Sequence, residues 1–245
     1  MPLNISGSVI NSGIARTLNY KSIVTRGIIF QADAGAPDSY PETGTTANSL
    51  VGNYSGTLVN GVGYSTSNGG TWTFDGTNDY IEFTGTDAIL NGLSSATLSF
   101  WINATRTNTF DQLAGWRTGG GGMEFFILLL DSGGGTVNTE ARVTTTGGGP
   151  WDINVPFQSY FGSWVNIAFI VSSNRTDLYF NGSNVGSNTN KTGTFNSSLG
   201  SLYLGGYLTT FPSQANIANV IAYNRALSQA EITQNFNSQR GRFGV

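Results

Sequence analysis

The sequence contains neither cysteine nor histidine, and only 10% of its 245 residues are charged. The lack of cysteine excludes disulfides and thiolate metal sites. The lack of histidine excludes Ser-His-Asp catalysis, histidine zinc sites and the usual proton shuttle near neutral pH. No apolar run reaches the roughly 18 residues that a membrane helix needs, so we expect no membrane insertion. The segment Met1–Ser8 lacks the basic and apolar regions of a secretory signal, so we expect no signal peptide.

The residues that are abundant favour an all-β fold. Glycine occurs 34 times, and fifteen Phe, ten Tyr and five Trp can fill a sandwich core. Short apolar runs separated by Gly, Asn and Ser recur along the chain, which is typical of a β-sandwich or barrel. We expect residues 1–26 to form an extended arm and residues 27–245 to form one domain that starts with a buried strand at Gly27–Ala32.

Several runs have the alternation or the length of strands. Leu98–Asn103 alternates so that its apolar residues share one face and Trp101 points the other way. Trp164–Val171 alternates in the same manner. Met123–Leu130 is apolar apart from Glu124, which predicts a strand covered on both faces. Asn181-Gly182 predicts a tight hairpin turn directly after the strand-like run Leu178–Phe180.

One segment near the end of the sequence has the signals of a helix. Ser228 can cap its start, and Glu231 completes a capping box three residues later. Leu227 and Ile232 are placed to form a hydrophobic staple across the first turn. Gly241 is the expected end of the helix.

The segment Phe74–Phe83 predicts a hairpin whose tip is rich in side-chain oxygens. Such oxygens suit Ca²⁺, with backbone carbonyls or Asp33 completing the site. The alternative is that these side chains hydrogen-bond the turn backbone. The candidate calcium ligands are Asp75, Asn78 and Asp79. We expect no other cofactor.

In the same segment, Phe-Asp-Gly-Thr-Asn-Asp-Tyr resembles a signature of laminin-G-like, concanavalin-A-like jelly-roll domains. Leu98–Asn103, Trp164–Gly182 and Ile217–Glu231 resemble later segments of that family in the same order. The resemblance implies a two-sheet jelly-roll sandwich with one short C-terminal helix. The family's Gly-x-Ile-Asp-Asp appears as Ala215–Asn219, and this loss of carboxylates argues against a family-type calcium site near the last strand.

The opening segments Gly27–Gly35 and Ser39–Pro41 and the closing segment Ile217–Glu231 also resemble virion proteins of tailed bacteriophages. This implies a non-enzymatic structural protein of a phage virion, as a capsid decoration or a head or tail accessory protein. It would lie on the virion surface after synthesis in the host cytoplasm, with other virion proteins as partners, as a homo-oligomer or in many copies on a shell. The alternative is a glycan-binding adhesin or receptor-binding tail protein that recognises a host surface polysaccharide.

For the adhesin alternative, exposed aromatic rings would stack on sugars while polar side chains bond their hydroxyl groups. Three of the five candidates lie beside glycine runs, at residues 119–122 and 147–149. None of the three glycine runs, which include 133–135, is followed by the Lys-Ser/Thr of a phosphate cradle. The alternative is that these aromatic residues pack over sheet edges or at subunit contacts. The candidate glycan-binding residues are Arg117, Trp151, Asp152, Tyr160 and Tyr207.

Positive charge is concentrated at the two ends of the sequence. Residues 1–26 and 237–245 contain five basic and no acidic residues, whereas the whole chain has a net charge of −3. The acidic middle disfavours nucleic acid. The two ends are candidates for docking onto an acidic partner. The alternative is that their charge is uneven only because short segments often have an uneven composition. The candidate docking residues are Arg16, Lys21, Arg26, Arg240 and Arg242.

The acidic residues do not follow the catalytic pattern of related glucanases. Concanavalin-type glucanases carry Glu-x-Asp-x-x-Glu on one strand, and no Glu here is followed by Asp two residues later. Glycosidases pair two carboxyl groups across the scissile bond, and carboxyls from separate strands could still meet. We expect no enzyme activity. The glutamates concerned are Glu42, Glu82, Glu124, Glu140 and Glu231.

Overall fold

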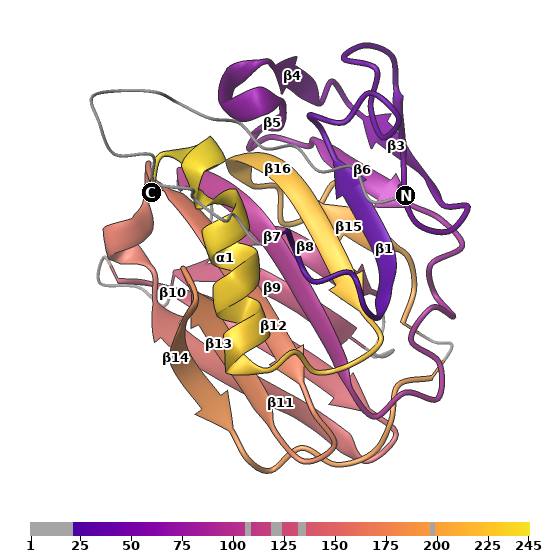
Figure 1. Cartoon of the computed structure of the whole chain (residues 1–245), viewed down its shortest axis with the longest axis vertical. Helices are drawn as coiled ribbons and strands as arrows, with labels where there is room; N and C mark the ends of the chain where they lie inside the picture. The colour runs from indigo at the N-terminus through magenta and orange to yellow at the C-terminus, as the bar shows by residue number, and fades with distance from the viewer. Residues whose placement is uncertain (1–21, 106–108, 119–123, 132–135, 197–198) are drawn as a thin grey trace, which may run out of the picture.

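Two antiparallel sheets of eight strands each stack face to face in the computed structural model (Figure 1). The model describes residues 22–105, 109–118, 124–131, 136–196 and 199–245. One sheet, called the front sheet here, lies under the helix in Figure 1, and the other is called the back sheet. This arrangement confirms the predicted two-sheet sandwich.

The front sheet has the strand order β14 (Ser183–Asn188), β13 (Thr176–Phe180), β12 (Trp164–Val171), β7 (Ala96–Thr105), β16 (Gln214–Tyr223), β5 (Thr71–Asp75) and β4 (Gly63–Ser65), and β1 (Ile28–Asp33) also pairs with β16. The back sheet has the order β11 (Gly148–Pro156), β10 (Val137–Thr145), β9 (Glu124–Asp131), β8 (Phe110–Arg117), β15 (Leu202–Leu204), β6 (Tyr80–Phe83), β3 (Ser55–Val59) and β2 (Thr46–Asn48). The remaining elements are the 3-10 turns η1 (Ser67–Gly69) and η2 (Gln158–Tyr160) and the helix α1 (Gln229–Phe243).

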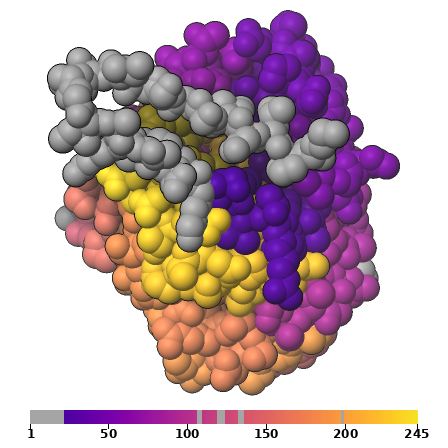
Figure 2. Space-filling model, in the orientation of Figure 1, coloured from indigo at the N-terminus to yellow at the C-terminus, as the bar shows by residue number. Residues whose placement is uncertain are grey.

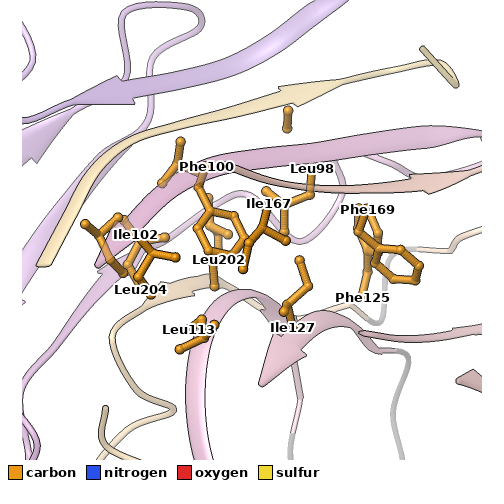
Figure 3. Close-up of a cluster of buried hydrophobic side chains, with 14 of the residues drawn as sticks. Leu98, Phe100, Ile102, Leu113, Phe125, Ile127, Ile167, Phe169, Leu202 and Leu204 are labelled. Carbon is orange, nitrogen blue, oxygen red and sulfur yellow. The ribbon is translucent and has the colours of Figure 1, made fainter. Parts of the chain in front are cut away.

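The main core lies between the sheets, where the inward side chains of both interdigitate (Figure 3). Phe100 of β7 and Phe169 of β12 point from the front sheet, and Phe125 and Ile127 of β9 point from the back sheet. All four are fully buried. Burial stabilises the fold by about 1.5–3 kcal/mol for each such side chain. The predicted alternation of Leu98–Asn103 and Trp164–Val171 is therefore confirmed.

The outer face of the front sheet is covered by α1. Trp101 points away from the main core, as predicted, and its ring stacks on Phe243 of the helix with 4.2 Å between centroids. Its indole Nε1 donates to Gln239 Oε1 at 2.7 Å. A fully buried Trp normally needs such a partner for its N–H. Trp101 of β7 thus anchors the C-terminal turns of the helix on the sheet.

The helix starts as predicted and ends later than predicted. Ser228 and Glu231 form the complete capping box. We predicted an end at Gly241, but the helix runs through Gly241 to Phe243 and is capped by Gly244 in a left-handed conformation. An internal glycine costs about 1 kcal/mol, which the packing of Phe243 on Trp101 offsets. In the described part of the chain, no helix is long and apolar enough to cross a membrane.

The predicted hairpin at Phe74–Phe83 is wrong. Strand β5 belongs to the front sheet and β6 to the back sheet, so residues 76–79 form an arch between the sheets. Trp72 and Phe74 of β5 and Ile81 and Phe83 of β6 are all buried in the main core. Because the chain crosses between the sheets at this arch, the apolar side chains of β5 face those of β6 across the core. The hairpin predicted at Asn181-Gly182 is confirmed between β13 and β14.

The described end of the predicted arm lies against the domain. Val24 N–H donates to Asn235 Oδ1 of α1 at 2.8 Å, and its carbonyl accepts from Tyr223 Oη at 3.0 Å. Ile23 also packs against the cluster that contains Tyr223 and Ile232. In Figure 2 the indigo N-terminal residues lie beside the yellow helix. Residues 1–21 lie outside the described residues.

Candidate functional site

One row of side chains crosses the outer face of the back sheet, the face turned away from the main core. Strand register places six residues opposite one another in turn: Asp152, Arg142, Phe126, Gly115, Tyr203 and Glu82. Residues two positions along each strand point the same way, which adds Glu140, Glu124 and Arg117. Gln112 joins them because a bulge between Gln112 and Ala114 shifts the register of β8, and its Oε1 accepts from Arg117 Nη1. We call these residues, together with Tyr207 and Phe211 of the loop after β15, the outer-face cluster.

Arg142 is the centre of the acidic side of this cluster. Its Nε and Nη2 donate to the two oxygens of Asp152, each at 2.9 Å. Nη2 also lies 3.2 Å from Glu140 Oε1, and Nη1 lies 3.9 Å from Glu124 Oε2. Three carboxylates on three neighbouring strands therefore converge on one guanidinium. Such two-pronged pairing gives a charge-assisted hydrogen bond a fixed geometry.

Arg117 is enclosed by aromatic rings. Its guanidinium carbon lies 4.7 Å from the ring centre of Phe126, 5.2 Å from that of Tyr207 and 4.6 Å from that of Phe211. Its Nε lies 3.2 Å from Glu124 Oε1. Gly115 leaves room beside Phe126, because a Cβ there would lie 2.3 Å from Phe126 Cα. The rings and Glu124 hold this side chain in one place.

The loop between β15 and β16 carries two rings over the sheet in a strained backbone. Leu208 and Phe211 have φ of 52° and 54°, a region that branched and bulky residues rarely adopt. Phe211 packs edge-on against Phe110, with 5.6 Å between ring centres. Phe110 and Leu208 are each 40% exposed. The loop therefore leaves an apolar edge open to solvent beside Arg117.

Burial affects three polar groups of the cluster. Gln112 is fully buried, its Oε1 accepts from Arg117 Nη1 at 3.3 Å, and its Nε2 has no hydrogen-bond partner among the described residues. An unpaired buried donor is costly and is satisfied by a ligand or water. Burial raises the pKa of Glu140, and the nearby Arg142 opposes that rise. Burial also raises the pKa of Tyr203, whose Oη donates to Glu82 Oε1 at 2.9 Å.

The structure brings together three of the five candidate glycan residues. Arg117, Asp152 and Tyr207 all belong to the outer-face cluster. Trp151 pairs with Val143 of β10, so it faces the inner side of the back sheet and packs at the margin of the main core. Tyr160 packs against Phe157 and Phe180, with 5.1 Å between its ring centre and that of Phe180. These two positions match the alternative reading that the aromatic residues pack at sheet edges.

Most residues of the outer-face cluster are not among those that the sequence predicts for the site. The alternation of side chains along a strand places Glu124 on the same face as Phe126, and Glu140 on the same face as Arg142. This much can be predicted from the sequence. The signal that β9 is covered on both faces was also correct: Phe125 is in the main core and Phe126 is buried on the outer side. Met123 lies outside the described residues. The register that aligns these strands was not available from the sequence.

The candidate calcium ligands lie in the arch between β5 and β6. Asp75 Oδ1 accepts from Thr77 N–H at 2.7 Å, as in the turn alternative. Asp79 is 3% exposed; its Oδ2 accepts from Asp75 N–H at 3.2 Å, and its Oδ1 has no hydrogen-bond partner among the described residues. Burial raises the pKa of Asp79. The Asn78 carbonyl accepts from Asn60 Nδ2.

Other findings bear on the calcium prediction. Asp33 pairs with Asn219 and Asp75 with Gln214 on β16, so the two are about 15 Å apart along the strand. Asp33 is thus not part of this group. Across the described ranges, no three or more Asp and Glu side chains form a group suited to a metal ion.

The candidate docking residues have different surroundings. Arg242 is held within the chain by Asp33. Arg240 Nε donates to the Val245 carbonyl, and its guanidinium lies over Phe236. Arg26 is exposed, and its carbonyl accepts from Arg225. Arg16 and Lys21 lie outside the described residues.

Residues 75–233 match the family model described as the concanavalin A-like lectin/glucanases superfamily. Among curated proteins, no sequence matches this chain. The structure is similar to domain 4 of an extracellular arabinanase from Geobacillus stearothermophilus, solved in complex with arabinotriose. The identity is 18% and the TM-score 0.62, over 85% of this chain and 98% of that chain.

Two larger structures are also similar. The binding domain of Paraclostridial mosquitocidal protein 1 has 20% identity and a TM-score of 0.67, over 86% of this chain and 52% of that chain. Trypanosoma rangeli sialidase in complex with sialic acid has 14% identity and a TM-score of 0.65, over 97% of this chain. This chain spans 36% of the sialidase chain. At these identities the similarity shows the fold alone.

Proposed function

The chain belongs to the concanavalin A-like lectin/glucanase superfamily, and we propose that it is a carbohydrate-binding protein whose ligand occupies the outer-face cluster without being cleaved. The observation that carries this proposal is the position of Arg117 among the rings of Phe126, Tyr207 and Phe211, next to carboxylates and an amide. Ligand sites combine apolar and aromatic surface with a few fixed polar groups. Rings can cover the apolar face of a sugar, and fixed carboxylates can accept its hydroxyl hydrogens.

The strained loop supports the same assignment. Bulky residues with positive φ persist only where the surrounding structure holds them, and they cluster at ligand sites. Here Leu208 and Phe211 of one loop both adopt such a conformation, and the ring of Phe211 lies against Arg117. The similarity to an arabinanase domain that was solved with arabinotriose adds support, because this chain covers 98% of that domain.

The proposal is tested by screening the wild-type protein on a glycan array and measuring the affinity of each hit by calorimetry. Tyr207→Ala removes a ring over Arg117 and is expected to weaken binding at least tenfold. Tyr179→Ala, a half-buried tyrosine of the front sheet, is the control and is expected to bind normally.

A second matched pair uses exposed leucines. Leu208→Ala changes the exposed side chain next to Tyr207 in the loop between β15 and β16 and is expected to weaken binding, whereas Leu50→Ala, at 39% exposure and before β3, is not. A wild-type protein that binds no glycan contradicts the proposal. Equal losses in both members of a pair would move the ligand elsewhere on the molecule.

A structural role in a phage virion is the second proposal, and it is compatible with glycan binding. The docking of Val24 onto Asn235 and Tyr223 favours it, because these contacts hold the described end of the predicted arm on the domain surface. Quantitative mass spectrometry of purified particles tests it. Hundreds of copies indicate a shell protein, a few dozen or fewer indicate the neck or tail, and absence contradicts a virion role.

A further inference from the structure

The two guanidinium groups of the outer-face cluster are already paired with carboxylates of the chain. Arg142 donates to both oxygens of Asp152 at 2.9 Å and lies 3.2 Å from Glu140. Arg117 lies 3.2 Å from Glu124 and is enclosed by rings. A ligand carboxylate would therefore have to displace a carboxylate of the chain to reach either arginine.

Carboxylates outnumber guanidinium groups in the cluster. Glu82 adds a fourth acid, so the described residues of the cluster have four acidic side chains against two arginines. The whole chain is acidic as well, with a net charge of −3. Like charges in a half-buried site repel more strongly than in water, because the local dielectric is lower. The face is thus unfavourable for a second set of negative charges.

The same groups suit the hydroxyl groups of an uncharged sugar. Carboxylate oxygens accept hydrogen bonds from hydroxyls, and such charge-assisted bonds are stronger than neutral ones. We propose that the outer-face cluster selects uncharged sugars and rejects glycans with carboxylates, such as those of uronic or sialic acids. This inference rests on the proposed carbohydrate-binding function.

The test compares glycans that differ only in a carboxylate. Sialylated glycans are paired with their desialylated forms, and oligogalacturonates with their methyl esters, on an array and then by calorimetry. We expect the uncharged member of a pair to bind at least tenfold more tightly. Its affinity is expected to change less than twofold between 50 and 500 mM NaCl, because no charge pair forms with the ligand.

A charge variant sharpens the comparison. Glu140→Gln removes one negative charge at nearly constant shape and is expected to reduce the discrimination several-fold. Glu42→Gln, which removes an exposed charge before β2, is the control and is expected to retain it. The salt dependence of the wild-type protein keeps the test valid if Glu140→Gln fails to fold.

The outcomes separate this inference from the function on which it rests. If carboxylate-bearing glycans bind as tightly as their uncharged partners, or more tightly, the inference is wrong and the carbohydrate-binding function stands. If the wild-type protein binds no glycan of either kind, both are wrong. Preference for the uncharged member, reduced in Glu140→Gln and kept in Glu42→Gln, supports both.

Discussion

Asp33 and Arg242 form a two-pronged ion pair that joins the end of β1 to the last turn of α1. Arg242 Nη1 lies 2.7 Å from Asp33 Oδ2, and Nη2 lies 2.9 Å from Oδ1. The same guanidinium donates to the carbonyls of Asn68, Gly69 and Gly70. Five oxygens therefore surround one positive charge of the chain. Asp33 lies opposite Asn219, where the family pattern has carboxylates, so the chain supplies its own cation beside the last strand.

Replacing this arginine is expected to loosen the helix. Arg242→Met leaves the Asp33 carboxylate without its partner, and breaking a buried ion pair costs about 3–5 kcal/mol. Because this pair is only partly buried, we expect a loss near the lower end, measured by urea unfolding. Arg240→Met is the control on the same helix turn, where the guanidinium is exposed, and a change below about 0.5 kcal/mol is expected. Equal losses of unfolding free energy in the two variants would contradict the role of the five oxygens around Arg242.

Local signals predicted much of this fold because their causes are local. The capping box needs only Ser228 and Glu231, and the Asn181-Gly182 turn needs only its two residues. The opposite faces of Leu98 and Trp101 follow from strand geometry. The arch at residues 76–79 was mistaken for a hairpin because the same turn residues serve both. What separates them is the pairing of β5 with β16 and of β6 with β15.

The candidate site was harder to predict because it depends on register between distant strands. Arg117 and Tyr207 are 90 positions apart in the sequence, and only the order β8-β15 brings them together. Trp151 and Asp152 are neighbours in sequence but point to opposite faces of β11. A shift of one residue exchanges these faces. Residue type alone therefore could not show that Asp152 lies in the outer-face cluster and Trp151 at the margin of the main core.

Gly115 is expected to tolerate no side chain. Its φ is +144°, and a Cβ there would lie 2.3 Å from Phe126 Cα and 2.4 Å from the Phe125 carbonyl oxygen. Gly115→Ala must therefore move β8 away from β9, at about 2–4 kcal/mol in unfolding free energy and with reduced glycan affinity. Gly85 also has a positive φ, but a Cβ there would meet no other atom. Gly85→Ala is therefore expected to cost about 1 kcal/mol in unfolding free energy. A harmless Gly115→Ala would contradict the close approach of the strands.

The helix cap is expected to weaken in acid. Hydrogen bonds from Arg225 and from the Ser228 backbone lower the pKa of Glu231 from 4.5 to about 2. The ionised carboxylate therefore contributes stability above pH 4.5, and this contribution is lost as the pH falls towards 2. Glu231→Gln should cost about 1–2 kcal/mol at pH 7, the size of a lost cap. Urea unfolding should show that the difference from the wild-type protein shrinks as the pH falls below 4.5; a constant difference would contradict this account.

Asp79 is expected to have the opposite pH dependence. Burial raises its pKa above 3.8, so the folded protein favours the protonated carboxyl. Its contribution to stability is complete below pH 3.8 and is lost as the pH rises through the folded pKa. Asp79→Asn is neutral at every pH and keeps an acceptor for Asp75 N–H. In EDTA, the melting temperature of Asp79→Asn should therefore rise relative to that of the wild-type protein as the pH rises towards 7.

Calcium gives the same carboxylate a second readout. If Ca²⁺ binds at Asp75, Asn78 and Asp79, it supplies a partner for the buried Asp79 Oδ1, and the cost of ionising that group falls. Adding CaCl2 at pH 7 should then raise the melting temperature of the wild-type protein and leave Asp79→Asn unchanged. Equal melting temperatures of the wild-type protein in CaCl2 and in EDTA would contradict the calcium prediction. The pH prediction would stand, because it depends only on the burial of the carboxyl group.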